Sequence, residues 1–441
     1  MNAITELSLL DGPVPVALWV LGAAAIAFLV VRRSWRWWLF AFAAAGAAAL
    51  LSMAATWSVI HVFYWWAEDL PATVTVDLAL ALWAVAMGCT TALAGLRRKG
   101  PRRASPGRRP LAVAATVVVL AVAGLQVNAY FGEFPTVGSL LGQQPTATRM
   151  PLPPLQHADG ARHEAAAVAA HWQAPAGLPA KGTLLSAAIP GTVSGFKARD
   201  AVVYLPPAYS ATDRPVLPVL VLVSGQPGSP ESWLRSTNLV DDLDSFAAAH
   251  KGLAPLVVIP DPNGSDKTNT MCMDSDLARA DSYMSKDVPN WIKSHLDADS
   301  NPAHWAIGGF SYGGTCSVQM VTRHPDVYQS FMAISPEREP ALAAKRSVTI
   351  DRAFHGDEAA FVSQLPLTLM AKHDYPAIHG WFAAGSQDAT YSANVRALMK
   401  AGEKAGMGVA SQSFPGGHSW TVANLALKPG LDFIYSRIGL L

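Results

Sequence analysis

The segment of the chain with the clearest chemical signature is WAIGGFSYGGTC, residues 305–316. Within it, Gly309, Ser311 and Gly313 form a GxSxG pattern between an apolar run and a helical stretch. A serine on such a tight strand-to-helix turn has an exposed hydroxyl near a helix N-terminus, where it can attack a carbonyl carbon. Glycines are needed there because neighbouring chains crowd the turn. We therefore expect Ser311 to be a catalytic nucleophile.

A serine nucleophile needs a general base, and the base needs a carboxylate that orients it. On a strand–turn–helix scaffold these groups follow in the order serine, acid, histidine. Asp388 follows the apolar run WFAAG, and His418 follows the run ASQSF and a Gly-Gly turn. Taken singly, Asp388 could be a helix N-cap and His418 an exposed loop residue. Their order, each after its own strand, predicts a triad of Ser311, Asp388 and His418.

The chain has 12 histidines, and most of them precede Ser311 or follow it too closely to serve as its base. Three later histidines remain as rivals: His355, His373 and His379. None of the three follows a late apolar run as His418 does. The rival acids are Asp357 and Asp374, for which helix capping is a sufficient explanation.

An oxyanion hole needs two backbone N–H donors that point to where the carbonyl oxygen becomes negative. The residue after the nucleophile, Tyr312, is expected to supply one. The loop SGQPG, residues 224–228, should supply the other, and Gln226 is the candidate because Pro227 has no N–H. The alternative is that this loop is an ordinary Gly/Pro turn.

The three cysteines lack the paired spacing of a zinc site. Cys272 follows one strand, and Cys316 lies five residues after Ser311, so we hypothesise a disulfide between them. Cys89 lies in an apolar stretch and is expected to serve packing. Residues 261–266, DPNGSD, are similar to a calcium loop but lack its Gly at position six and Glu at position twelve. We expect no metal and no organic cofactor.

Short apolar runs separated by turn residues predict the strands that must position these groups. They are residues 200–205, 216–223, 256–260, 305–309, 331–335, 381–385 and 410–414. Helical stretches alternate with them at 232–250, 282–296, 315–325 and 392–406. Nearly continuous apolar strands are typical of a sheet that is buried on both faces and mainly parallel. Residues 182–441 are thus expected to form one α/β domain with a doubly wound sheet.

Four stretches near the N-terminus contain no charged residue: 13–31, 37–60, 78–96 and 110–132. Each is close to the ~20 residues that cross a bilayer as a helix, so we expect four transmembrane helices. Residues 1–11 lack the basic region of a cleaved signal peptide, and the first helix is expected to stay in the protein. Asp77, at the end of a span, is the one candidate for an ionisable group inside the membrane. An anchor therefore explains the helices better than a transporter does.

The loops predict the orientation in the membrane. Two loops are basic, with Arg32, Arg33 and Arg36 in the first and Arg97, Arg98, Lys99, Arg102, Arg103, Arg108 and Arg109 in the second. The other loops carry only acidic residues, namely Glu6, Asp11, Glu68, Asp69 and Asp77. The Lys/Arg bias places the basic loops in the cytoplasm and the rest of the chain outside it. The expected domains are an anchor at 1–131, an extracytoplasmic linker at 132–181 with one helical stretch at 157–172, and the catalytic domain at 182–441.

The composition supports this division. Of 441 residues, 51% are hydrophobic and 15% are charged, and the mean hydropathy is +0.22. These values exclude a disordered protein and fit an ordinary soluble enzyme poorly. With 33 Lys and Arg against 32 Asp and Glu, the chain offers no surface for a polyanion, so we expect no nucleic-acid partner.

Four segments together carry a resemblance to a known family: AVVYLPPAYS, LPVLVLVSGQPGSPESW, GGFSYGGTC and GGHSW. Residues 182–441 resemble the esterase D-type serine esterases and the related mycolyltransferases, which have the α/β-hydrolase fold. The resemblance implies Ser311 as nucleophile, His418 as base and Asp388 as its partner, with Gln226 and Tyr312 as oxyanion donors. Many of these esterases have His-Gly in the oxyanion loop, where this chain has Ser224-Gly225.

These observations predict a membrane-anchored, extracytoplasmic serine esterase that forms an acyl-enzyme. Its expected substrates are lipid or cell-envelope esters, and its other partner is the bilayer. One alternative is an acyltransferase that moves the acyl group to a sugar hydroxyl. Another is a non-catalytic surface protein that keeps the fold for binding.

Overall fold

The computed structural model describes residues 4–32, 34–64, 66, 68, 70–93, 108–156, 169 and 172–441. It divides into two compact units, Met1–Gln143 and Gln144–Leu441, here called the helical unit and the sheet unit. Most of the second basic loop and of the helical stretch expected at 157–172 lies outside the described residues. The same holds for Arg33 and Asp69.

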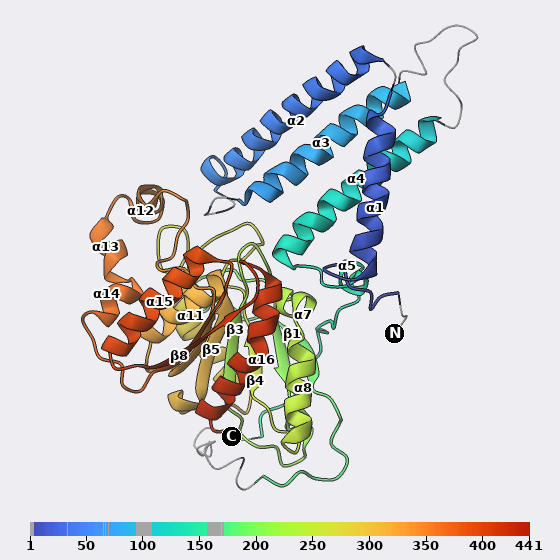
Figure 1. Cartoon of the computed structure of the whole chain (residues 1–441). Coiled ribbons are helices and arrows are strands. Elements are labelled where there is room, and N and C mark those ends of the chain that lie inside the picture. Colours follow the sequence, from blue (N-terminus) through green and yellow to red (C-terminus); the bar gives the residue numbers. More distant parts are fainter. Residues whose placement is uncertain are drawn as a thin grey trace. The chain divides into compact units, whose positions relative to one another are not determined.

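Four long helices make up the helical unit, followed by the short α5, Val137–Leu140 (Figure 1). They are α1 (Pro13–Val30), α2 (Trp35–His61), α3 (Ala72–Leu93) and α4 (Arg108–Phe131). All four are long and apolar enough to cross a membrane, as expected, and between 17% and 33% of each span is buried inside the protein. Small residues allow close packing: a Cβ at Gly22 of α1 would lie 2.8 Å from Val122 Cγ2 of α4.

Helix α3 begins six residues before the uncharged stretch that predicted it, so Asp77 lies inside the helix and not at its end. Pro71 precedes the helix and accepts a hydrogen bond from Val74 N at 3.0 Å, which starts the first turn. The buried Asp77 carboxylate accepts a hydrogen bond from Gln126 Nε2 of α4 at 2.5 Å. A paired carboxylate is tolerated within an apolar helix bundle where an isolated one is not.

The sheet unit is built on eight strands in the order β1-β2-β4-β3-β5-β6-β7-β8. Their bounds are β1 Thr183–Ala187, β2 Ala201–Leu205, β3 Val219–Val223, β4 Leu256–Ile259, β5 Trp305–Phe310, β6 Ser330–Ile334, β7 His379–Gly385 and β8 Gly408–Phe414. Strands β3 to β8 run parallel, while β1 and β2 are antiparallel to their neighbours. All seven predicted strands are present. Strand β1 was missed because TLLSA is partly exposed and has no long apolar run.

Helices cover both faces of this sheet, which has the α/β fold that the sequence predicted. Their bounds are α7 Ser232–Ser236, α8 Leu239–Ala249, α9 Ala280–Ser282, η3 Tyr283–Asp287, α10 Val288–His295, α11 Tyr312–Arg323, α12 Arg346–Phe354, α13 Glu358–Ser363, α14 Pro366–Met370, α15 Ala389–Lys404 and α16 Trp420–Arg437. On β5, Gly309 faces α11, whereas the next residue, Phe310, contacts Trp420 of α16. Successive residues of a strand point to opposite faces, so α11 and α16 lie on opposite sides.

Several helices were not predicted. The stretch 232–250 forms two helices instead of one. Helix α16 contains Pro429, which disguises the helical pattern, and its Gly430 packs against Met332 and Trp381. Helices α12 to α14 lie between β6 and β7, and α12 and α13 share a small apolar core with Met271 and Met273, which come from the loop after β4.

The expected linker divides between the two units. Residues 132–143 belong to the helical unit, and the described residues from 144 onward belong to the sheet unit. Thr148 pairs with β1, where Ser186 N donates to Thr148 O at 3.0 Å. Trp172 Nε1 donates to Lys251 O at 2.9 Å. These parts of the linker are therefore bound to the surface of the sheet unit.

Candidate active site

The turn between β5 and α11 carries Ser311 in a left-handed backbone conformation, with φ 57° and ψ −117°. Ser311 N donates to Ile334 O of β6 at 2.8 Å, which fixes the turn to the neighbouring strand. A Cβ at Gly309 would lie 2.3 Å from the backbone carbon of Gly313, and a Cβ at Gly313 would lie 2.0 Å from Val223 O. Only glycine fits at either position, which explains the spacing of the GxSxG pattern.

The loops that follow β7 and β8 meet this turn. His418 Nε2 lies 2.8 Å from Ser311 Oγ, within hydrogen-bond distance. His418 Nδ1 lies 3.4 Å from Asp388 Oδ2, a distance that is long for a hydrogen bond. The side chains of His418 and Asp388 are 17% and 10% exposed. The structure thus brings together the three residues that chain order had grouped, and catalytic contacts of this kind often shorten when substrate binds.

Two aromatic rings hold the imidazole in place. Tyr391 stacks on His418 with ring centroids 3.9 Å apart, and Phe310 stacks with centroids 5.0 Å apart. These contacts restrict the ring to an orientation in which Nε2 faces the serine. Neither contact could be predicted from the sequence, because the three residues come from three different elements.

Asp388 is also the N-cap of α15. Its Oδ1 accepts a hydrogen bond from Tyr391 N at 3.0 Å, while Oδ2 faces His418. The two explanations considered for this residue from the sequence therefore coexist. Gly385 makes the approach possible, because a Cβ there would lie 2.3 Å from Gly416 O in the loop that carries the histidine.

The loop after β3 lies next to the nucleophile turn. Ser224 Oγ donates to Ser229 O at 2.6 Å and closes the loop. A Cβ at Gly225 would be 3.4 Å from Phe310, the residue before Ser311. Tyr312 is the first residue of α11, so its N–H is among those that lack a partner within the helix. Gln226 and Tyr312 thus stand on the two segments beside Ser311, and their role as oxyanion donors remains a prediction.

A disulfide joins Cys272 and Cys316, whose Cα atoms are 5.4 Å apart, and both cysteines are buried. Among the described residues no group of three or more His, Cys, Asp or Glu is arranged to hold a metal ion. In the loop that is similar to a calcium site, Asp261 and Asp266 both form ion pairs with Arg199. Burial acts to lower the pKa of Arg199, but the hydrogen bonds and charges of these carboxylates outweigh it and raise the pKa.

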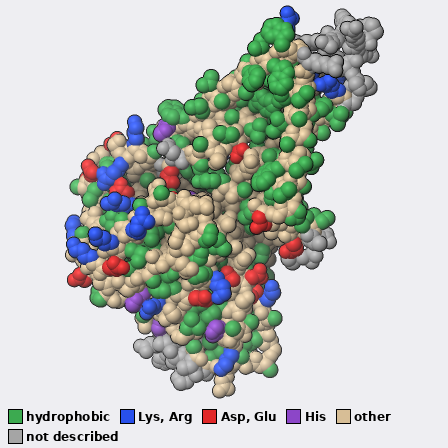
Figure 2. Space-filling view, viewed as in Figure 1, with side chains coloured by type: hydrophobic (Ala, Val, Ile, Leu, Met, Phe, Trp, Pro, Cys, Tyr) green, Lys and Arg blue, Asp and Glu red, His purple; other side chains and the backbone are tan. Residues whose placement is uncertain are grey.

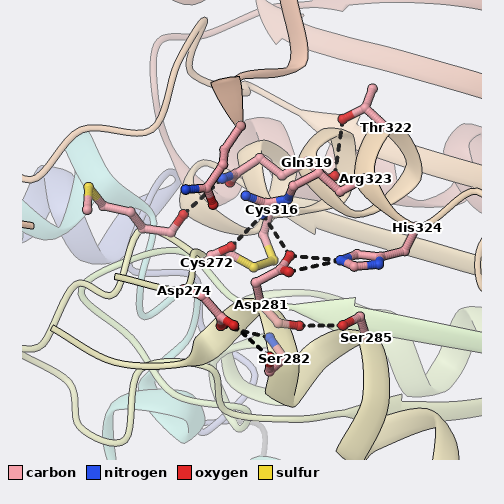
Figure 3. A network of polar contacts seen from close by, with 12 residues as sticks. Cys272, Asp274, Asp281, Ser282, Ser285, Cys316, Gln319, Thr322, Arg323 and His324 are labelled. Atoms are coloured by element: carbon pink, nitrogen blue, oxygen red, sulfur yellow. Dashed lines mark hydrogen bonds and ion pairs between the residues drawn. A yellow bond between two sulfur atoms is a disulfide. The ribbon is translucent and has the colours of Figure 1, made fainter. Parts of the chain in front are cut away.

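A second charged cluster lies beyond the disulfide, at the far end of α11 (Figure 3). Asp281 accepts from His324 Nε2 at 2.9 Å and pairs with Arg323 at 3.0 Å. Burial alone would raise the pKa of Asp281, but the hydrogen bond from His324 and the charge of Arg323 prevail and lower it. The cluster is a structural ion-pair network, distinct from the three residues at the nucleophile turn.

The rival histidines lie elsewhere. His355 is exposed and pairs with Asp276. His379 begins β7, at the opposite end of the strand from Asp388, and burial together with the charge of Arg437 lowers its pKa. His373 lines a surface cavity of about 600 Å³ with Asp374 and Tyr375, between the end of α11 and the start of β7.

A mainly parallel sheet with a serine on the turn after β5, and a histidine and a carboxylate on the loops after β8 and β7, defines an α/β-hydrolase. The family model described as "Putative esterase" matches residues 197–434, more than half of the chain, and the chain belongs to this esterase family. It is therefore an enzyme, a carboxylic ester hydrolase or an acyltransferase.

An uncharacterised protein of Corynebacterium glutamicum is 36% identical over 342 residues, which cover 75% of this chain and 77% of that protein. This share of the chain exceeds the length of the sheet unit, so the similarity extends into the helical unit. A solved ferulic acid esterase has a TM-score of 0.50 at 18% identity, covering 59% of this chain and 99% of its own. An S-formylglutathione hydrolase from Agrobacterium tumefaciens also scores 0.50, at 17% identity, covering 59% and 97%. These two structures share the fold of the sheet unit.

Proposed function

We propose that this enzyme is a membrane-anchored serine esterase whose sheet unit lies outside the cytoplasm and hydrolyses lipid or cell-envelope esters. Ser311 is the nucleophile, His418 the base and Asp388 the carboxylate that orients the base. The observation that carries the proposal is the 2.8 Å contact between His418 Nε2 and Ser311 Oγ, on a turn that only glycines permit.

The reaction begins when His418 Nε2 takes the hydroxyl proton and Ser311 Oγ attacks the ester carbonyl. Asp388 keeps the proton of the imidazole on Nδ1 and stabilises the imidazolium that forms. The negative carbonyl oxygen is bound by the N–H groups of Gln226 and Tyr312. His418 then protonates the leaving alcohol, and a water molecule activated by the same imidazole releases the acid from Ser311.

The membrane location supports a preference for esters within or close to a bilayer. Four helices confine the enzyme to a thin layer at the membrane, which raises its effective concentration toward substrates held in the same layer. The basic loops support an extracytoplasmic position of the sheet unit. Labelling by a membrane-impermeant maleimide in intact cells tests this side, using Ser436→Cys in a Cys89→Ala background. A cysteine that is labelled only after lysis would overturn the orientation.

Labelling with a fluorophosphonate tests the nucleophile, because the probe forms a covalent bond with an activated serine. The wild-type protein should be labelled and Ser311→Ala should not, while the matched control Ser436→Ala, at an exposed serine, should be labelled as wild type. Equal labelling of Ser311→Ala and wild type would contradict the assignment.

The same acyl-enzyme can pass its acyl group to a sugar hydroxyl instead of water. Product analysis with a model ester, with and without a sugar acceptor, distinguishes the two reactions. An acylated sugar as the main product would replace the esterase proposal with that of an acyltransferase.

A further inference from the structure

The loop after β4, residues 261–272, is linked to both segments that carry the oxyanion donors named above, directly to the start of α11 and through Arg199 to the loop after β3. We call it the brace loop. Its beginning holds Arg199, which contacts the loop after β3, and its end holds the side chain of Tyr312 at the start of α11. The brace loop contains none of the three residues of the triad.

At the first contact, Arg199 joins the brace loop to the loop that carries Gln226. Arg199 Nη2 donates to Gly228 O at 2.8 Å, and Nε donates to Asp261 Oδ2 at 2.7 Å. Asp266 pairs with Nη1 of the same guanidinium. Asp261 is 3% exposed and Arg199 29%, so the bond between them is largely shielded from water, whereas Asp266 is 68% exposed. The planar guanidinium has fixed donor directions and therefore holds Gly228 in one place.

The loop after β3 is packed so closely that a displacement of Gly228 must move its neighbours. A Cβ at Gly228 would lie 2.6 Å from Gly225 O, and Gly225 itself lies against Phe310. Gln226 stands between these two glycines. The direction of its N–H therefore depends on where Arg199 holds the Gly228 carbonyl.

At the second contact, the brace loop anchors the side chain of the other donor residue. The hydroxyl of Tyr312 accepts a hydrogen bond from Cys272 N at 3.0 Å and shares another with Thr270 Oγ1 at 2.9 Å. All three residues are buried. Fixing the ring and hydroxyl of Tyr312 restricts the movement of the whole residue, including its backbone N–H.

One face of α11 holds the end of the brace loop (Figure 3). Besides the disulfide from Cys316, Gln319 Nε2 donates to Met271 O at 3.1 Å and Arg323 Nη2 donates to Cys272 O at 2.7 Å. Together with Tyr312 these residues are spaced four, three and four apart, which places them on one side of the helix. The end of the loop is thus attached along the length of α11.

We propose that the brace loop positions both oxyanion donors, Gln226 through Arg199 and Tyr312 through its own hydroxyl. The inference rests on the proposed function and deepens it. Donors that are already oriented stabilise the transition state without reorganisation at the moment of reaction. Arg199 and the Tyr312 hydroxyl are positioning groups, and their loss should lower kcat with little change in KM.

The first test compares Arg199→Met with Arg149→Met in the full-length protein. Arg149 forms an exposed ion pair with Asp200, next to Arg199 in the sequence, and serves as the matched control. Arg199→Met should lower kcat for a soluble model ester roughly 10- to 100-fold, less than the loss of a whole donor. It should weaken binding of a trifluoromethyl ketone, which forms a tetrahedral adduct, by the same factor. A wild-type kcat in Arg199→Met would overturn this part of the proposal.

Loss of Arg199 leaves Asp261 buried and without its cation, which could destabilise the fold. The double variant Arg199→Met/Asp261→Asn removes that buried charge, while the loop after β3 still lacks the hydrogen bond from Arg199 to Gly228 O. It should melt close to wild type and still show the low kcat. Recovery of kcat in the double variant would mean that Arg199 acts on stability alone.

The second test compares Tyr312→Phe with Tyr328→Phe. Each variant removes one buried hydroxyl. The hydroxyl of Tyr328 donates to Met284 O at 2.9 Å, away from the site. Tyr312→Phe should lower kcat several-fold and Tyr328→Phe should not. Because the two contacts are separate, combining Arg199→Met with Tyr312→Phe should multiply the losses. Equal rates for the two tyrosine variants would refute the second contact.

Failure of the inference and failure of the proposed function give different results. A wild-type protein that the fluorophosphonate does not label overturns the proposed function, and the brace with it. Labelling at Ser311 together with wild-type kcat in both Arg199→Met and Tyr312→Phe overturns the brace alone.

Discussion

The helical unit and the sheet unit place their apolar side chains in opposite ways. In the helical unit Leu50 is 71% exposed and Val113 56%, whereas the strands β2 to β6 are buried throughout. Figure 2 shows apolar side chains over the long helices, with most charged side chains on the sheet unit. The proposed membrane anchor accounts for the difference: lipid would be the apolar medium for the side chains of the first unit, as the protein core is for those of the second.

Two glycines, one in each unit, differ in what crowds them. In the sheet unit Gly313 meets the backbone oxygen of Val223, whereas in the helical unit Gly88 meets the side-chain oxygen of Thr116, each at 2.0 Å from a hypothetical Cβ. A side chain can rotate away and a strand cannot. Catalysis in the sheet unit depends on fixed backbone, while helix packing in a bilayer tolerates adjustment.

The largest expected effect separates catalysis from anchoring. His418→Ala removes the base next to Ser311 and should lower kcat/KM by about 10⁴- to 10⁶-fold. Fractionation should still find the protein in the membrane, because the helices are unchanged. An active His418→Ala would show that another group serves as base, and His379→Ala is the control because it lies at the other end of β7.

The glycine comparison gives the next largest effect. Gly313→Ala should destabilise the sheet unit by about 3 kcal/mol, since the methyl group meets backbone. Gly88→Ala should cost under about 1 kcal/mol, because Thr116 can rotate and alanine favours the helix. Denaturant titration in detergent measures both costs: loss of fluorophosphonate labelling reports unfolding of the sheet unit, and the part of the helix-content transition that does not coincide with this loss reports the helical unit. Similar costs at the two sites would refute the distinction.

Removing the helical unit should affect one kind of substrate only. A protein of residues 144–441 should hydrolyse a soluble short-chain ester at the full-length rate, because the core cluster that includes the sheet lies within this range. On an ester embedded in vesicles its rate should fall roughly 10- to 100-fold, because the effective concentration is lost. Equal losses on both substrates would show that the helices do more than anchor.

The smallest effect is a pH dependence confined to the sheet unit. The pKa of Asp281 is lowered from 3.8 in the folded protein, so its ion pairs stabilise the fold above that value. This stability is lost as the pH falls below about 4 through the lowered pKa. Asp281→Asn should therefore reduce the melting temperature at pH 7, and this reduction should become smaller as the pH falls below 3.8. The exposed Asp351→Asn should leave the melting temperature unchanged, and an equal reduction by Asp281→Asn at neutral and at acidic pH would contradict the linkage.

The positions of Ser311, Asp388 and His418 could be predicted because each follows a strand whose apolar run is plain in the sequence. Parallel strands end at one edge, so residues that follow them must converge there. The four long helices were predictable for a similar reason, because an uncharged apolar stretch of about 20 residues can be recognised without knowing which segments it packs against.

The brace loop could not be predicted in this way. Arg199 precedes a strand and contacts Asp261, 62 residues away, with no periodicity to connect them. The pairing of Asp77 with Gln126 across two helices could not be predicted for the same reason, and neither could the start of α3 at Ala72, before the uncharged stretch. Strand β1 was missed because an exposed edge strand needs few apolar residues. Contacts between segments that are distant in the sequence can be found only in the folded structure, whereas an apolar run that forms a buried strand can be recognised from its own residues.

The two carboxylate oxygens of Asp388 have different roles, since one caps the N-terminus of α15 and the other faces the imidazole of His418. Asp388→Ala would therefore unwind the first turn of a helix as well as remove a charge, and its phenotype would mix the two. Asparagine keeps an oxygen for the helix and presents an uncharged amide to the ring, which makes it the informative replacement. Because one carboxylate both caps α15 and faces the base, a relative that lost the acid would also need another N-cap for this helix.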